Sequence, residues 1–157
     1  MKRRILSILG SAVLFEMKNQ IVENLRKQGF AVEDLGTNSA DSVDYPDFAE
    51  KATAKVLAGQ ADLGILVCGT GIGISIAANR HKGIRAAILY DDYVAKVARE
   101  HNNANVLCFG GRTVFSVRCF SCGVFCAVFS GRCLPFVRSG ILRRPVFCPA
   151  YFLLSRK

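Results

Sequence analysis

The sequence has no run of about 18 uncharged apolar residues, the length that a membrane-spanning helix needs, so we expect no transmembrane segment and no membrane partner. It is not short of hydrophobic residues, since 51% of its 157 residues are apolar and 21% are charged. This composition excludes a wholly disordered chain and a collagen-like chain. The length fits one globular domain with a core of its own.

Acidic residues are missing from one part of the chain. Residues 1–114 contain 14 Lys or Arg and 12 Asp or Glu, whereas residues 115–157 contain seven Lys or Arg and no acid. The basic side chains of the second segment are scattered among Phe, Cys, Val and Leu, so we do not expect them to bind nucleic acid. We divide the chain into a domain, 1–114, and an atypical tail, 115–157. The tail shows neither strand nor helix periodicity, which leaves a shifted reading frame and disorder as its two interpretations.

Metal-binding and targeting patterns are also lacking. Cys119 and Cys122 form a C-x-x-C pair, but a zinc site needs a second pair at matching spacing, and neither histidine lies nearby. The basic residues 2–4 and the apolar run 5–15 resemble the start of a signal peptide, but no small-residue cleavage pattern follows. We interpret this run as a buried first strand, and we expect reduced thiols and a cytoplasmic location.

What the sequence does contain is an alternation of strand and helix patterns. Segments with helical spacing or helix-start signals separate short apolar runs, and Asp47 is expected to cap the second helix. Because the strands are continuous apolar runs, they predict an α/β fold with a parallel sheet covered by helices on both faces. Ligands of such sheets bind at the carboxyl ends of the strands, here chiefly the third and the fifth. The five strands are expected at 4–11, 31–35, 61–68, 84–89 and 105–109.

A glycine-rich segment, 67–75 (VCGTGIGIS), follows the third strand and opens a helix. Its spacing matches neither a dinucleotide fingerprint nor a phosphate-binding loop, which argues against a nucleotide-binding module. Free N–H groups at the helix start favour an anion, and Cys68 beside them would have a raised thiolate fraction. Such a thiolate could act as a base toward a C–H acid while the N–H groups hold the oxyanion. Taken alone, the segment is equally consistent with Cys68 being a small residue of the core and not a base.

Three further segments contain candidate site residues. His101 lies at the end of a helix among amide side chains, which suggests either proton transfer or a charge interaction with the helix dipole. Tyr45, in a turn that leads into a helix, is a candidate pocket hydroxyl. Arg112, after the fifth strand, is a candidate contact for an anion or a hydroxyl.

Taken together, these segments resemble the ribose-5-phosphate isomerase B / galactose-6-phosphate isomerase family (RpiB, LacA and LacB). The resemblance covers about residues 16–114, and the combination of motifs is highly specific although no single motif is. The segments that carry it are 42–47 (SVDYPD), 68–79 (CGTGIGISIAAN), 83–87 (GIRAA), 99–102 (REHN) and 105–107 (NVL).

The resemblance implies a Rossmann-like three-layer fold and aldose–ketose isomerisation of a sugar phosphate through an enediolate, without metal or organic cofactor. The first substrate pair to consider is ribose 5-phosphate and ribulose 5-phosphate, of the pentose phosphate pathway; allose and galactose 6-phosphates stay open. The resemblance also implies a homodimer, or a tetramer built from dimers. The site would lie between two subunits, with the partner copy supplying His101 and Asn102.

The resemblance also implies a role for each candidate residue. Cys68 would be the base that moves the proton between C1 and C2, and His101 would assist opening of the furanose ring. The backbone of 69–73, with Thr70, would stabilise the enediolate. The implied contacts to the substrate are Tyr45, Gly69, Gly71, Ile72, Gly73, Asn102 and Arg112.

The chain departs from the family pattern in two places. The family follows its first strand with an Asp-His pair, whereas here 12–14 are Ala, Val and Leu. The family's C-terminal segment supplies arginines to the phosphate, and nothing after Val114 aligns with it. The alternative to an active enzyme is therefore a catalytically impaired family member. A local change of reading frame would explain both departures, and the encoding DNA would test it.

Overall fold

The computed structural model of the chain describes residues 4–9, 12–36 and 44–113. Strands and helices alternate along these residues, as the sequence pattern predicts. The expectations for the tail, 115–157, lie outside the described residues. The elements are β1 (Arg4–Leu9), α1 (Ala12–Lys27), β2 (Ala31–Asp34), α2 (Tyr45–Leu57), β3 (Leu63–Cys68), α3 (Ile72–Asn79), β4 (Ala86–Ile88), α4 (Asp92–Glu100) and β5 (Val106–Gly110).

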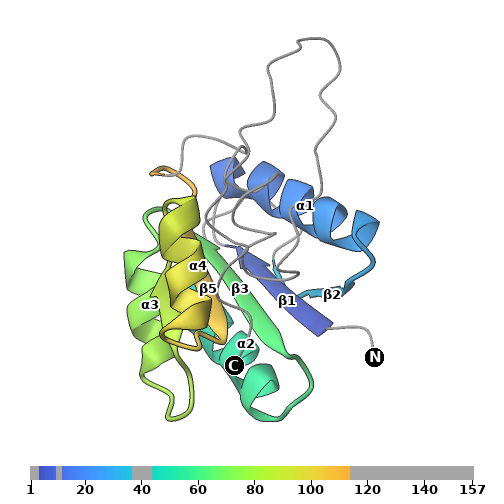
Figure 1. Ribbon diagram of the computed structural model, residues 1–157. Helices are drawn as coiled ribbons and strands as arrows, with labels where there is room; N and C mark the ends of the chain where they lie inside the picture. The colour runs from blue at the N-terminus through green and yellow to red at the C-terminus, as the bar shows by residue number, and fades with distance from the viewer. Residues whose placement is uncertain (1–3, 10–11, 37–43, 114–157) are drawn as a thin grey trace, which may run out of the picture.

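The five strands form one sheet in the order β2-β1-β3-β5-β4, and every neighbouring pair is parallel (Figure 1). The connection from β4 through α4 returns inward, so that β5 lies between β3 and β4. This return brings the carboxyl ends of β3 and β5 together, with Cys68 paired to Gly110. The expected five-stranded parallel sheet is confirmed.

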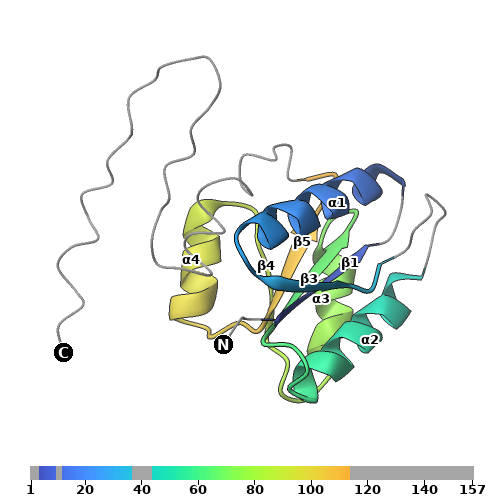
Figure 2. The same cartoon turned by 90° about the vertical axis from the view of Figure 1, so that its right-hand side faces the viewer.

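Helices cover both faces of the sheet. Figure 2 shows α1 on one side of the sheet and α2 with α3 on the other. Every residue of β3 and β5 is buried, and successive side chains enter opposite cores, as the period of two of a strand requires. The core between the sheet, α1 and α4 includes Ile21, Leu25, Ile65, Val67, Ala95, Ala98, Leu107 and Phe109. The core between the sheet, α2 and α3 includes Ala49, Ala52, Leu66, Cys68, Ile74, Ala78, Val106 and Cys108.

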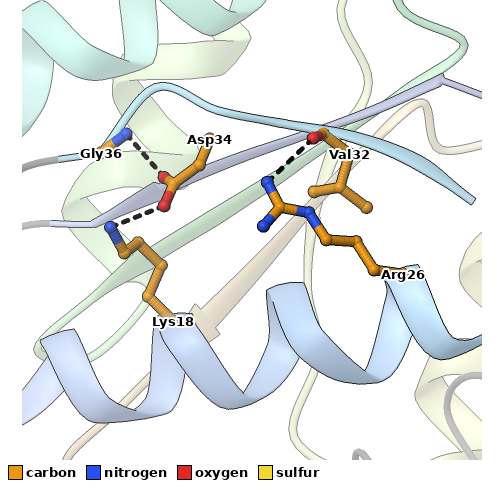
Figure 3. A network of polar contacts seen from close by, with 5 residues as sticks. All are labelled: Lys18, Arg26, Val32, Asp34 and Gly36. Carbon is orange, nitrogen blue, oxygen red and sulfur yellow. Dashed lines mark hydrogen bonds and ion pairs between the residues drawn. The ribbon is translucent and has the colours of Figure 1, made fainter.

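Helix α1 is fixed to β2 by two polar contacts (Figure 3). The ammonium of Lys18, whose side chain is 1% exposed, lies 2.7 Å from a carboxylate oxygen of Asp34. The other carboxylate oxygen of Asp34 accepts a hydrogen bond of 2.9 Å from the N–H of Gly36. In the last turn of α1, the guanidinium of Arg26 donates to the carbonyl of Val32. These contacts hold the edge strand β2 against α1.

The start of α2 differs from the prediction. Asp44, not Asp47, is the residue before the helix, and Asp47 lies inside the first turn. Pro46 explains the difference, because its fixed φ suits the first turn of a helix, where no intrahelical partner for its missing N–H exists. Asp47 still places a negative charge at the positive end of the helix dipole. The shift also makes Tyr45 the first residue of α2.

No helix within the described ranges is both long and apolar enough to cross a membrane.

Candidate active site

The segment between β3 and α3 places Cys68 at the end of a buried strand, as predicted. The Cys68 side chain is 6% exposed, and its Sγ accepts a hydrogen bond of 3.1 Å from the backbone N–H of Gly71. The next N–H, that of Ile72, donates to the hydroxyl oxygen of Thr70 at 3.3 Å. The turn therefore folds back on the sulfur and directs the Gly71 N–H toward it.

This turn can form only because two glycines allow the backbones of β5 and the turn to come close. Gly71 has a φ of +80°, and a Cβ there would lie 3.0 Å from the carbonyl carbon of Phe109. A Cβ on Gly110 would lie 2.5 Å from the carbonyl carbon of Thr70. Backbone hydrogen bonds join the same two segments, from Gly111 to Cys68 at 2.8 Å and from Arg112 to Gly69 at 2.9 Å. Close packing and backbone hydrogen bonds thus hold the turn after β3 against the end of β5.

Two predicted substrate contacts lie against the turn. A Cβ on Gly73 would be 2.8 Å from the hydroxyl oxygen of Tyr45, so this hydroxyl lies directly beside the first turn of α3. The guanidinium of Arg112 lies over Gly69, with Nε 3.9 Å from where a Cβ would be. Both side chains are exposed. The structure therefore brings a thiol, a phenol and a guanidinium to one glycine-rich turn.

The electrostatics of the turn favour an anion. The first turn of α3 contains no acidic side chain, so nothing there opposes the positive end of the helix dipole. The first N–H groups of a helix have no partner inside the helix and can bind a ligand, although that of Ile72 already donates to the Thr70 hydroxyl. Such an arrangement can hold an oxyanion close to a thiol. Among the described residues, no group of His, Cys, Asp and Glu is placed to hold a metal ion.

Cys108 is a feature of the site that the sequence patterns did not indicate. It lies on β5 opposite Leu66, in the same core as Cys68, and both cysteines are free thiols. Burial raises the pKa of the Cys108 thiol far above its ordinary value, and the charge of a Cys68 thiolate raises it further. The signal that could have found it is the period of two, which sends alternate residues of each buried strand into the same core.

The structure does not bring His101 and Asn102 to this turn within one chain. Helix α4 starts after Asp91, beyond the carboxyl end of β4, and ends before the amino end of β5. Both residues are exposed at that amino end, while Cys68 lies beside Gly110 at the other end of β5. A strand of this length separates the two edges by about 13 Å at 3.3 Å per residue. The expected position of His101, at a helix end before the fifth strand, is confirmed.

A parallel sheet that brings a thiol and the start of a helix together at the carboxyl ends of its strands is an α/β arrangement suited to a small anionic ligand. Comparisons with known proteins give the family. The model of the Ribose/Galactose Isomerase family matches residues 7–121, and the chain belongs to this family of sugar-phosphate isomerases. The resemblance drawn from the sequence motifs is confirmed.

Relatives and solved structures agree with this assignment. Ribose-5-phosphate isomerase B of Escherichia coli is 48% identical over 100 residues, which cover 64% of this chain and 67% of that one. Galactose-6-phosphate isomerase subunit LacB of Clostridium acetobutylicum is 44% identical over 108 residues, covering 69% and 62%. The crystal structure of a ribose 5-phosphate isomerase from Thermotoga maritima superposes with a TM-score of 0.76 at 42% identity, covering 83% of this chain and 88% of that one.

Proposed function

We propose that this chain interconverts ribose 5-phosphate and ribulose 5-phosphate through an enediolate, with Cys68 as the base, as a step of the pentose phosphate pathway. The observation that carries the proposal is the Cys68 sulfur at the end of β3, held by the Gly71 N–H beside the start of α3. Relatives named ribose-5-phosphate isomerase B support the choice of substrate.

The isomerisation moves one proton between two carbons. The Cys68 thiolate takes the proton from C2 of the open-chain aldose, and the electron pair of that C–H bond moves through C1 onto O1. The N–H groups of the first turn of α3, with the Thr70 hydroxyl, stabilise the resulting enediolate. The proton of the C2 hydroxyl passes to O1, the Cys68 thiol returns its proton to C1, and the C2 oxygen becomes the ketone oxygen. A positioned base contributes about 10²–10⁴-fold and an oxyanion donor about 10²–10³-fold.

Two exposed side chains are the proposed contacts to the rest of the substrate. Tyr45, beside Gly73, is placed to hydrogen-bond a sugar hydroxyl. Arg112, over Gly69, is placed to offer a planar pair of donors to a hydroxyl or a phosphate oxygen. The remaining contacts to the substrate would come from backbone, that of Gly69, Gly71, Ile72 and Gly73. A side chain at any of the three glycines would occupy space beside the turn.

We infer that a second copy of the chain completes the site, in a homodimer or in a tetramer of dimers. The inference rests on the distance between the two edges of the sheet, because His101 and Asn102 cannot reach Cys68 of their own chain. Ring opening needs a proton moved from the O1 hydroxyl to the ring oxygen as the bond between C1 and that oxygen breaks. An imidazole such as that of His101 suits this step at neutral pH.

Free thiols at Cys68 and Cys108 fit a reducing compartment, and hence the cytoplasm.

The sequence at 12–14 favours a second candidate, an impaired isomerase. Ala, Val and Leu stand where the family pattern has an Asp-His pair, and side chains of these types donate no hydrogen bond. Each charge-assisted hydrogen bond that the substrate no longer receives costs about 1.5–3 kcal/mol. An impaired enzyme would therefore keep the chemistry of Cys68 and show a greatly raised KM.

The test is the isomerase activity of the purified full chain with ribose 5-phosphate, beside Cys68→Ala and Cys108→Ala variants. Cys108→Ala is the matched control, because it removes a buried thiol from the same core. Activity that is lost only with Cys68→Ala supports the proposal. Equal activity of wild type and Cys68→Ala contradicts the role of Cys68. Cys68-dependent activity that appears only at very high substrate concentration favours the impaired candidate, and a folded wild-type chain without activity at saturating substrate contradicts both candidates.

A further inference from the structure

The turn between α4 and β5 combines exposed side chains with a tightly held backbone. His101 and Asn102 are exposed, yet their N–H groups both donate to the carbonyl of Val97, at 2.9 and 3.3 Å. The N–H of Asn103 donates to the carbonyl of Arg99 at 3.2 Å, and the Arg99 guanidinium donates to the carbonyl of Ala104. These hydrogen bonds fix the backbone of the turn that leads from α4 into β5.

Asn103 gives the turn its direction. Its φ of +47° is the sole positive value at a non-glycine residue in the part of the chain that the structure describes. Asparagine tolerates this left-handed conformation better than most residues do. The conformation redirects the chain from α4 into β5 immediately after Asn102, so it determines where the His101 and Asn102 side chains are presented.

Arg85 connects this turn to the loop before β4. Its Nε donates to the carbonyl of Asn103 at 2.8 Å, and its Nη1 donates to the carbonyl of Gly83 at 3.2 Å. Its backbone N–H donates to the side chain of Asn105 at 2.8 Å, and that side chain donates in turn to the Gly83 carbonyl at 3.0 Å. One guanidinium thus joins two loops at the residue whose conformation sets the turn.

We propose that Arg85 is a positioning residue, which holds the Asn103 turn so that His101 and Asn102 are already oriented for the site of a second copy. The inference rests on the proposed function, because it assigns His101 to opening of the sugar ring. A turn held in one conformation before assembly loses little conformational entropy when it enters the second site. Misplacement of a reacting group by about 1 Å can lower a rate about 100-fold.

The two substrates of the reaction separate this role from a general loss of structure. Ribose 5-phosphate is a closed ring, and it must open before Cys68 can act. Ribulose 5-phosphate cannot close a five-membered ring, because the oxygen that would close it carries the phosphate. Exchange of its C1 hydrogen with D₂O therefore needs the base and the enediolate turn, but no ring opening.

The experiment compares Arg85→Met with Arg80→Met in the full-length chain. Arg80 is an exposed arginine at the end of α3, outside the proposed site and outside this network. We expect Arg85→Met to slow isomerisation of ribose 5-phosphate about 100-fold while deuterium exchange into ribulose 5-phosphate changes less than about threefold. Arg80→Met should change neither rate. Arg85→Lys, the milder variant in case Arg85→Met does not fold, should show the same separation at about tenfold.

The outcomes distinguish the two proposals. If Arg85 variants lose isomerisation and exchange to the same extent, or lose neither, the positioning role of Arg85 is wrong while the proposed function stands. If the folded wild-type chain shows neither isomerisation nor exchange, the proposed function is wrong and the role of Arg85 falls with it.

Discussion

The carboxyl and amino edges of the sheet are built by different means. At the carboxyl edge, the site around Cys68 consists largely of backbone and glycine, and it depends on the close approach of two strand ends. At the amino edge, polar side chains such as those of Arg85 and Asn105 hold the backbone behind exposed His101 and Asn102. The first edge can hold an anion beside a thiol, and the second can present an imidazole outward. Neither edge contains both parts of the proposed chemistry.

The largest expected loss of stability and activity comes from a substitution at the carboxyl edge, Gly110→Ala. A methyl group there would lie 2.5 Å from the Thr70 carbonyl carbon and would also overlap the Thr113 hydroxyl, so Gly110→Ala forces the turn and β5 apart. We expect a loss of about 3 kcal/mol in the free energy of unfolding, at the upper end of the usual cost of overpacking. We also expect about a 100-fold loss of activity from displacement of the turn.

Urea denaturation and an isomerase assay check this prediction, with Gly69→Ala as the stability control. A Cβ on Gly69 meets only the Arg112 side chain at ordinary contact distance, so this variant should unfold like the wild type. Equal stability of Gly110→Ala and Gly69→Ala would show that Gly110 and the turn are not packed as closely as described.

At the amino edge, the next largest effect is expected from substitution of Asn105. Its side chain joins the backbone N–H of Arg85 to the carbonyl of Gly83, and Asn105→Ala removes both hydrogen bonds. At about 1 kcal/mol for each bond, the free energy of unfolding should fall by about 2 kcal/mol. The comparison with Gly110→Ala is sharpened by deuterium exchange into ribulose 5-phosphate, which Asn105→Ala should leave close to the wild-type rate. Loss of that exchange would mean that the two edges are not independent.

Alkaline pH should destabilise the folded chain through the buried thiol of Cys108. The folded-state pKa of Cys108 lies far above its ordinary value of 9.0, so the folded chain keeps a proton that the unfolded chain releases. Its contribution to stability is present below pH 9 and is lost as the pH rises above it. The loss amounts to about 1.4 kcal/mol for each pH unit above 9. The measurement is urea denaturation at pH 8, 9 and 10, in which Cys108→Ala should show a shallower decline than the wild type, and identical slopes would contradict the burial of this thiol.

The smallest expected effect concerns the conformation of Asn103. Asn103→Ala places a less tolerant residue at a φ of +47°, which should cost about 1 kcal/mol of stability. Asn103→Gly should be neutral, because glycine adopts positive φ without strain. Thermal denaturation of both variants checks this, and equal melting temperatures would show that the turn can relax.

The sequence predicts much of this structure because its strands and helices have strong local signals. Five apolar runs predict the parallel sheet, and the glycine-rich segment predicts the turn after Cys68. The prediction is wrong at the start of α2, because a proline in the first turn moves the boundary that Asp47 alone suggests. The boundary differences elsewhere are of one or two residues at strand ends, where local signals are weakest.

What the sequence could not predict depends on tertiary contacts. The order of the strands places β5 between β3 and β4, and with it Gly110 against Thr70; no local pattern contains this. The segment 83–87 supports the family resemblance, but it does not show that Arg85 reaches the carbonyl of Asn103.

The most direct test of the central claim, that a complete site needs both edges from two copies, is to mix two inactive variants. Cys68→Ala lacks the base and His101→Ala lacks the ring-opening group, so a mixed dimer contains one site with both defects and one with neither. After subunit exchange, an equal mixture should recover up to about one quarter of the wild-type isomerase activity, because half of the dimers have one intact site of two. A mixture that stays at the mean of the two single variants would contradict a site shared between two copies.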